Sequence, residues 1–366
     1  MDAATVSRLL RGFGIDASPS VVEPLGQGRI HKTFRCATDD GVYLLQRVNT
    51  SVFRDPSALA QAGRQVQRHL LEARATGRYR FEVPANLEAV GDRIDPTLPG
   101  LLRDEDGSIW RAMDFIHDSR GLEVAETLDQ AAEAGRAYGH FAAVMGTLSP
   151  DGFPVPLPGF HDPSRRFAEL QQVAATGGSD RLAGLQDDLN YCAACRDEIE
   201  GFVQASRSWT PRICHNDTKI DNLLFDSRGE RVVAVVDLDT TMPGFWAYDF
   251  GDLVRSVAAS GDEDQDDGPT LHLRDDYVEA VAEGFIDGLG PLADGSTRAM
   301  LWAGVRLMPL MLGMRFLADH LAGDRYFPVE REAQNLQRAR RQLALHRDGV
   351  RRESSLSRKI LASGTR

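Results

Sequence analysis

Apolar and polar residues follow one another along the amino-terminal part of the chain in a pattern that predicts a β-rich unit. Residues 21–50, VVEPLGQGRIHKTFRCATDDGVYLLQRVNT, predict a strand, a glycine loop, a second strand, a turn at Asp39-Asp40-Gly41 and a third strand. A helix is expected to begin at Pro56, because Asp55 is a preferred N-cap residue and proline is favoured at the first helical position. The segment SIWRAMDFI, residues 108–116, predicts a further strand.

Helical patterns predominate from Glu123 onward, with one exception. The segments NLLF (222–225), DSRGE (226–230) and RVVAVVDLD (231–239) predict a β-hairpin inserted among helices. The polar stretch HDSRG, residues 117–121, is the expected connection between two lobes. The sequence therefore predicts an α+β, bilobal fold, with a small β-rich lobe over residues 1–116 and a larger, mainly helical lobe over residues 117–366.

The most apolar segment of the chain is LWAGVRLMPLMLGMRFLA, residues 301–318. It contains Arg306, Pro309 and Arg315, which favour a kinked, buried helix over a membrane span. The amino terminus lacks the continuous apolar core of a secretory signal. We therefore expect a monomeric protein of the cytoplasm that makes no contact with a membrane.

Charge and cysteine content narrow the possible partners. The formal net charge of -12, from 54 acidic and 42 basic residues, provides no basic surface for nucleic acid or an anionic membrane. Cys192 and Cys195 have a spacing that could hold zinc, but no second close pair of cysteines exists. We expect both thiols to pack near one face of a single helix formed by DDLNYCAACRDEIEGF, residues 187–202, and free thiols suit a reducing compartment.

Two loops, one containing glycines and one acidic, match known binding motifs only in part. GQGRIHKT, residues 26–33, nearly matches a P-loop, but His31 stands at the second glycine position and a strand follows instead of a helix. Gly26 and Gly28 between two antiparallel strands instead match a phosphate-covering flap, or an ordinary glycine turn. SGDEDQDDGP, residues 260–269, has calcium-loop spacing of acids but a misplaced glycine, which favours a solvated acidic loop.

The stretch ICHNDTKIDNLLFD, residues 213–226, places many polar side chains between apolar runs, where desolvation is costly. Phosphoryl transfer needs a carboxylate to orient the attacking hydroxyl and oxygen ligands for Mg²⁺. His215 and Asp217, then Asn222 four residues later, reproduce the spacing H-x-D-x-x-x-x-N, and Asp237 follows the hairpin as the second magnesium ligand would. The alternative, that these residues only cap strands and a turn, requires several coincidences of spacing.

With these motifs, the chain resembles the aminoglycoside phosphotransferase and choline kinase group, and within it the bacterial N-acetylhexosamine 1-kinases. The resemblance is carried, in the family's order, by YLLQRVNTSVF, FHDPSRRF, HNDTKIDNLLFD, VVDLDTTMPGFWAYDFGDLVRS and GMRFLADHLAGDRYF. It implies a protein-kinase-like fold and ATP-dependent phosphorylation of the anomeric hydroxyl of N-acetylglucosamine or N-acetylgalactosamine.

The resemblance also implies residue roles. Asp217 would be the catalytic base, and Asn222 and Asp237 would bind Mg²⁺ on ATP. The expected nucleotide contacts are Gly26, Gly28, Gln46, Met113 and Phe115, and the expected sugar contacts are Lys219, Asp239, Arg315 and Tyr326. Gln46 stands where protein kinases keep a lysine that pairs with ATP, so other bases or magnesium must meet the phosphate charge.

Three alternatives remain open at this point. The chain could phosphorylate an aminoglycoside or an amino alcohol, since the acidic loop 262–267 could attract a polycation. It could be a nucleotide-binding scaffold without turnover, although Asp217, Asn222 and Asp237 are all intact. Arg315 could form a structural ion pair with Asp319, four residues further along a helix, instead of binding sugar.

Overall fold

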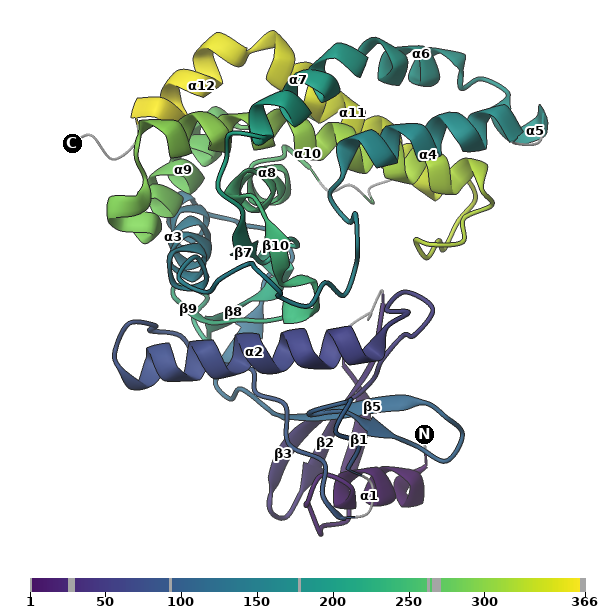
Figure 1. Cartoon of the computed structure of the whole chain (residues 1–366), viewed down its shortest axis with the longest axis vertical. Coiled ribbons are helices and arrows are strands. Elements are labelled where there is room, and N and C mark those ends of the chain that lie inside the picture. Colours follow the sequence, from purple (N-terminus) through teal and green to yellow (C-terminus); the bar gives the residue numbers. More distant parts are fainter. Residues whose placement is uncertain are drawn as a thin grey trace.

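The computed structural model describes residues 2–25, 30–91, 94–176, 179–261, 264 and 271–362. Gly26 and Gly28, and most of the acidic loop, lie outside the described residues. The structure has a β-sheet lobe and a helical lobe, which confirms the predicted α+β, kinase-like fold (Figure 1).

The small lobe is built around a five-stranded antiparallel sheet in the order β1-β2-β3-β5-β4. Its elements are α1 (Ala3–Arg11), β1 (Val21–Pro24), β2 (Lys32–Thr38), β3 (Gly41–Arg47), α2 (Pro56–Ala75), β4 (Leu102–Arg103) and β5 (Ile109–Asp114). The apolar side of α1 covers one face of the sheet, where Leu9 and Leu10 pack with Cys36 and Leu45. The strands predicted from alternation are therefore present.

Helix α2 links the sheet to the helical lobe. It begins as predicted, since Asp55 accepts hydrogen bonds from the backbone N–H groups of Ser57 and Ala58 and Pro56 follows the cap. Its buried residues Val66 and Leu70 belong to the large core of the helical lobe. In Figure 1 the helix accordingly lies across the junction of the two lobes.

The larger lobe follows from β6 onward. Its helices are α3 (Leu128–Met145), α4 (Pro163–Thr176), α5 (Ser179–Leu182), α6 (Gln186–Ala194), α7 (Arg196–Ser206), α8 (Trp246–Val257), α9 (Asp275–Leu289), α10 (Gly295–Leu321), α11 (Gln334–Arg351) and α12 (Glu353–Ala362), with short 3₁₀ turns at η2 (Ile220–Asn222), η3 (Leu238–Thr240) and η4 (Gly290–Leu292). Its strands are β6 (Ser119–Gly121), β7 (Arg212–Cys214), β8 (Leu223–Asp226), β9 (Val232–Val235) and β10 (Met242–Gly244). The predicted hairpin is β8 and β9, joined by a turn in which Gly229 has a φ of 75°.

Glycines allow two helix pairs of this lobe to approach backbone to backbone. A Cβ on Gly139 of α3 would lie 2.1 Å from the carbonyl oxygen of Phe285 in α9, and a Cβ on Gly251 of α8 would lie 2.1 Å from that of Gly304 in α10. Helix α10 is long and apolar enough to cross a membrane by composition, but 67% of its most apolar window is buried inside the protein. It is a core helix, as predicted.

One helix prediction was wrong. Residues 187–202 form two helices, α6 and α7, which meet at Cys195. Cys195 has φ and ψ of -83° and 5°, and this ψ departs from the value of about -42° of a regular helix. Cys192 and Cys195 are both buried, as packing requires.

Candidate functional site

A cleft of about 1240 Å³ lies between the sheet of the small lobe and the helical lobe. The helical lobe contributes Asp217, Asn222 and Asp237 to its lining, and the small lobe contributes Gln46, Met113 and Phe115. The cleft therefore brings together the residues expected to act on phosphate and the described residues expected to contact nucleotide.

The loop that carries Asp217 is held by a buried carboxylate. Asp249 of α8 accepts hydrogen bonds from the backbone N–H groups of His215, at 3.0 Å, and Asn216, at 2.7 Å. Asn216 has a φ of 62°, and its amide nitrogen donates to the carbonyl oxygens of Cys214, Thr240 and Met242. These bonds explain why asparagine stands at position 216, since it tolerates this conformation and ties the loop to the strands beside it.

Sequence reasoning missed Asp249. The signal that could have found it is a carboxylate among apolar residues in the segment WAYDFGDL, residues 246–253, where it is buried. Burial raises the pKa of Asp249 to about 7, although its two backbone hydrogen bonds act in the opposite direction.

Asp217 is oriented by two neighbours. The amide nitrogen of Asn222 donates to the Oδ2 atom of Asp217 at 3.0 Å and to its backbone carbonyl at 2.8 Å. The ammonium group of Lys219 lies 3.4 Å from the same Oδ2 atom. Burial opposes ionisation, but the charges of Lys219, His215 and Arg255, with the hydrogen bond from Asn222, together outweigh it and hold the pKa of Asp217 below its ordinary value. The carboxylate is thus ionised at neutral pH and able to accept a proton from a hydroxyl.

Asp237 and Asn222 fit a divalent cation. Limited hydration at the base of the cleft, together with the charges of Asp239 and Asp217, raises the pKa of Asp237 to about 6. Such a shift signals negative charge that lacks compensation. Because the amide nitrogen of Asn222 is bound to Asp217, its oxygen remains available as a ligand. Carboxylate and amide oxygens are the donors that Mg²⁺ prefers.

Asp239 lies deeper, in a set of contacts that joins the two lobes. Arg111 of β5 donates to both of its carboxylate oxygens, at 2.5 and 2.7 Å, and the Nε2 atom of His31 lies 2.8 Å from Oδ2. Despite burial, Arg111 and His31 together hold the pKa of Asp239 well below its ordinary value. Gln46 in turn accepts hydrogen bonds from Arg111 and donates to Thr33. Arg111 was not among the sequence-predicted site residues.

Met113 and Phe115 present apolar surface to the cleft at the end of β5. The backbone N–H of Phe115 donates to the carbonyl oxygen of Val42 at 3.1 Å. Its N–H is therefore already paired, and its ring contacts Arg35 and His117 at 5.5 and 5.3 Å.

Arg315 and Tyr326 lie outside the lining of this cleft, although Arg315 is close enough to Asp217 for their charges to interact. The guanidinium of Arg315 is centred 4.8 Å from the ring of Phe160, 5.6 Å from Tyr326 and 5.3 Å from Phe327. Loss of water lowers its pKa, while the negative charges of groups that include Asp217 act in the other direction. Arg315 has no ion pair with the residues that the structure describes.

The alternative of an ion pair between Arg315 and Asp319 is not what the structure contains. Asp319 accepts hydrogen bonds from the backbone N–H groups of residues 325–327 and from the side chain of Asn335. It therefore fixes the turn that carries Tyr326, and leaves Arg315 to its aromatic neighbours.

His161 joins the two regions. Its Nε2 atom donates to the carbonyl oxygen of Asn216 at 2.8 Å, and its Nδ1 atom has no partner among the described residues. Burial lowers the pKa of His161 to about 3, so the ring is neutral.

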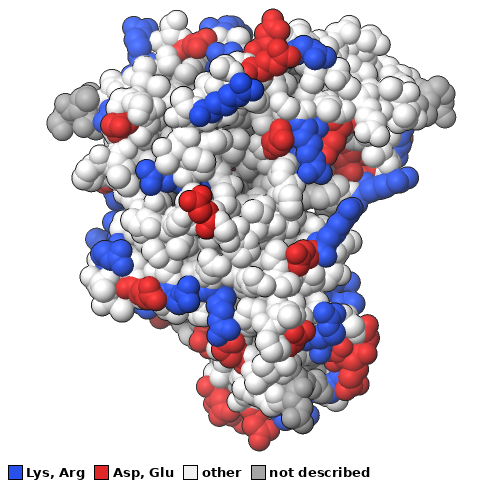
Figure 2. All heavy atoms as spheres, viewed as in Figure 1, with Lys and Arg blue, Asp and Glu red and all other residues white. Residues whose placement is uncertain are grey.

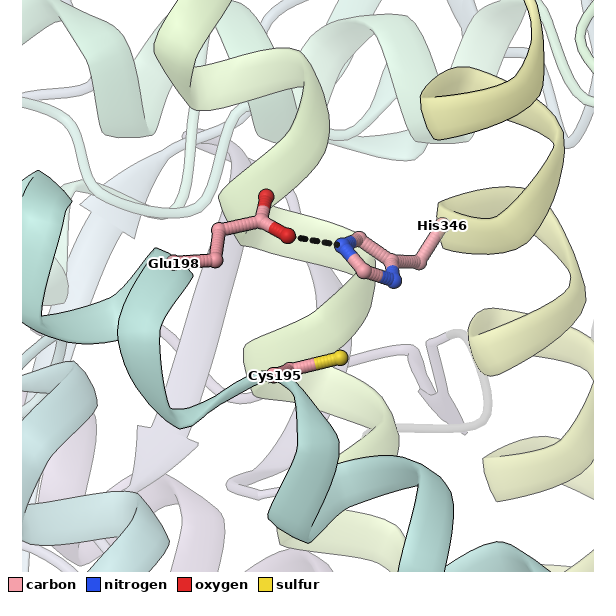
Figure 3. Close-up of side chains that lie close together, drawn as sticks. All are labelled: Cys195, Glu198 and His346. Carbon is pink, nitrogen blue, oxygen red and sulfur yellow. Dashed lines mark hydrogen bonds and ion pairs between the residues drawn. The ribbon is translucent and has the colours of Figure 1, made fainter.

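A separate group, Cys195, Glu198 and His346, gathers where α7 meets α11 (Figure 3). Its three possible ligand atoms lie within 4.8 Å of one another. Each acid or base already has protein partners, since Glu198 binds Arg306 at 2.9 Å and His346 binds Glu198 at 3.2 Å and the hydroxyl of Tyr191 at 2.7 Å. Burial also raises the pKa of the Cys195 thiol to about 11. We interpret this group as a hydrogen-bonded link between helices.

The kinase-like fold, with Asp217, Asn222 and Asp237 gathered in the cleft between its lobes, is the arrangement of a phosphotransferase. Residues 21–298 match the model of the phosphotransferase enzyme family, and the chain belongs to that family.

Solved structures share the fold at low sequence identity. A microcompartment-associated aminopropanol kinase is 17% identical, with a TM-score of 0.62 over 97% of this chain and 99% of that one. A choline/ethanolamine kinase family protein from Mesorhizobium loti is 18% identical, with a TM-score of 0.58 over 98% and 96%. A spectinomycin phosphotransferase, in complex with ADP and spectinomycin, is 13% identical, with a TM-score of 0.53 over 94% and 99%.

Proposed function

We propose that this protein is a small-molecule kinase that transfers phosphate from ATP to the anomeric hydroxyl of N-acetylhexosamines. Asp217 accepts the hydroxyl proton, and Asn222 and Asp237 hold Mg²⁺, which supplies charge neutralisation on the phosphates when bound. The spectinomycin phosphotransferase that shares the fold was solved with ADP, which supports ATP as the donor. We assign residues 1–116 to the nucleotide-covering lobe and residues 117–366 to the catalytic and acceptor-binding lobe.

One observation carries the choice of acceptor. Arg315 is a guanidinium surrounded by aromatic rings and without an ion pair among the described residues, close enough to Asp217 for their charges to interact. Its fork of N–H donors suits two hydroxyls, or a hydroxyl and an acetamido oxygen, and the aromatic rings suit the apolar face of a sugar. Tyr326, 42% exposed, stands at the edge of this group. Lys219 and Asp239 are the remaining proposed acceptor contacts, and they also form ion pairs with Asp217 and Arg111.

The second candidate is an amino alcohol or aminoglycoside as acceptor. It is favoured by the aminopropanol kinase and the choline/ethanolamine kinase family protein among the structures that share the fold. A cationic acceptor would meet Arg315 and the nearby charge of Arg166, and this like-charge contact favours the neutral sugar. On the face shown in Figure 2, acidic and basic side chains are interspersed, which offers no continuous basic tract to a nucleic acid there. We propose a monomeric protein of the cytoplasm.

Acceptor specificity is tested by measuring ADP release with purified protein, ATP and Mg²⁺. The acceptors are N-acetylglucosamine, N-acetylgalactosamine, glucosamine, glucose, kanamycin and 1-amino-2-propanol. We expect turnover with the N-acetylated sugars, and an anomeric phosphate in the ³¹P spectrum of the product. Faster turnover with kanamycin or 1-amino-2-propanol would establish the second candidate.

Two variants then connect specificity to the residues that carry the proposal. Arg315→Lys keeps the charge but loses the fork, so the KM for sugar should rise about tenfold or more while the KM for ATP changes little. Tyr326→Phe tests the hydroxyl alone. If both variants keep the sugar KM and the preference for the N-acetyl group, Arg315 has a structural role.

A further inference from the structure

The phosphates of a nucleotide bound in the cleft would need a nearby positive charge, and strand β3 has none at Gln46. Gln46 lies on β3 where a kinase of this fold would need a cation for the phosphates, and it is neutral. Lys219, on the other lobe, is occupied by Asp217 and lies 3.8 Å from Asp221. Of the described residues on the strands of the small-lobe sheet, Arg111 is the cation that lines the cleft.

The sheet register places Arg111 directly beside Gln46. The two residues are paired across β3 and β5, so their side chains point to the same face. Gln46 Oε1 accepts from Nε of Arg111 at 2.7 Å and also from Nη2, and the amide nitrogen of Gln46 donates to Thr33 at 2.8 Å. Both the oxygen and the nitrogen of the Gln46 amide are therefore hydrogen-bonded, and Gln46 orients the guanidinium of Arg111.

The hydrogen bonds of Arg111 leave one donor free. A guanidinium has five N–H donors. Gln46 takes the Nε donor and one Nη2 donor, and Asp239 takes the other Nη2 donor and one Nη1 donor. The second Nη1 hydrogen has no partner among the described residues, while the group is buried at 8% exposure in the wall of the cleft.

We propose that Arg111 is a phosphate-binding residue of the nucleotide site and supplies from β5 the charge that β3 lacks at Gln46. Gln46 and Asp239 act as positioning residues, which fix the fork of Arg111 and compensate its charge. Arg111 also lies close enough to Asp237 for their charges to interact, so it borders the place where the nucleotide phosphates and their cation would be held. Because Arg111 is largely shielded from water, a charge-assisted hydrogen bond from its guanidinium to a phosphate is strong. The inference rests on the proposed use of ATP.

The competing explanation is that Arg111 only ties the lobes together through Asp239. The two roles predict different effects on the binding of ligands that carry different numbers of phosphates. Loss of a phosphate contact weakens ATP and ADP but spares adenosine. Loss of a link between lobes alters the shape of the whole cleft, and weakens all three.

The test measures binding of ATP with Mg²⁺, ADP and adenosine by calorimetry, without any acceptor. We expect Arg111→Met to weaken ATP about 10- to 100-fold and adenosine less than about twofold. Arg111→Lys, which keeps a cation beside Asp239 and so protects folding, should weaken ATP by a smaller factor. Arg47→Met is the matched control, because Arg47 is an exposed arginine of β3 bound to Ser108, and it should bind all three ligands as the wild type does.

A second variant moves the charge. In the double variant Gln46→Lys with Arg111→Met, the cation returns to β3, and the affinity for ATP should recover by about threefold or more over Arg111→Met alone. Equal weakening of ATP and adenosine in Arg111→Lys, or no change of either, would overturn the proposal in favour of an interlobe link. Because no acceptor is present, the result does not depend on which hydroxyl is phosphorylated. Wild-type protein that binds ATP no better than adenosine would instead contradict the proposed use of ATP.

Discussion

At the scale of single residues, the position of each proton decides what the cleft can do. Lys219 and other nearby groups keep Asp217 ionised, whereas burial and the charges of Asp239 and Asp217 raise the pKa of Asp237, which has no ion pair among the described residues. Two carboxylates a short distance apart therefore have pKa values shifted in opposite directions. The division matches their proposed roles, proton acceptor and metal ligand.

Replacement of Asp217 by Asn tests the first of these roles. The variant keeps the shape of the side chain but cannot accept a proton, so kcat should fall about 100-fold or more while the KM values change little. Asp221→Asn is the control, since this exposed carboxylate also lies near Lys219, at 3.8 Å, whereas the amide of Asn222 donates to Asp217. Near-normal kcat in Asp217→Asn would remove the assignment.

At the scale of elements, the catalytic loop depends on how closely two helices pack. Helix α8 carries Asp249, which binds the backbone of the loop, and Gly251 brings α8 against α10. An added methyl group at position 251 would meet backbone, which cannot move aside as a side chain can.

Gly251→Ala should therefore lower the free energy of unfolding by about 1–3 kcal/mol, measured by urea denaturation. Gly201→Ala is the matched control, because Gly201 is exposed in α7 and no atom lies within 4 Å of the added Cβ. Its stability should stay the same or rise by up to about 1 kcal/mol, as helix propensity requires. Equal effects of the two substitutions would show that the close approach of α8 and α10 is not limiting.

Local sequence patterns predicted most helices and strands, but they failed where a contact between distant parts of the chain determines the structure. The strands of the sheet, the cap at Asp55 and the β8–β9 hairpin follow from alternation and turn residues. The break between α6 and α7 does not, because no glycine or proline marks it. Arg111 contacts Gln46 across 65 positions, and only the sheet register reveals that they are neighbours.

At the scale of the whole molecule, several buried neutral histidines make stability depend on pH. The pKa of His161 is lowered to about 3, mainly by burial, and those of His140, His215 and His320 are shifted in the same direction. The ordinary pKa of histidine is about 6.5, so between that pH and about 3 these histidines bind more protons in the unfolded chain than in the folded one. Their contribution to stability is thus fully present above pH 6.5 and is lost as the pH falls.

His161 alone should contribute a slope of up to about 1.4 kcal/mol per pH unit in this window. His161→Phe keeps the aromatic contacts with Phe160 and Tyr248 but loses the hydrogen bond to Asn216. We expect this variant to be less stable at pH 7.5, yet to lose less stability between pH 6 and 4.5 in urea titrations. An unchanged slope would show that His161 is protonated in the folded protein.

Lys219 has a practical consequence for anyone who labels this protein. The sequence has lysine at positions 32, 219 and 359, and of these Lys219 lines the cleft. Reagents that acylate amines, including acyl-phosphate derivatives of ATP, therefore meet few targets on the surface and a single lysine in the cleft wall. The strong preference of Lys219 for its charged form, through a pKa raised by Asp217 and Asp221 against the effect of burial, slows its acylation. Mass-spectrometric readout of that one site would report whether the cleft is empty or filled, without any mutation or radiolabel.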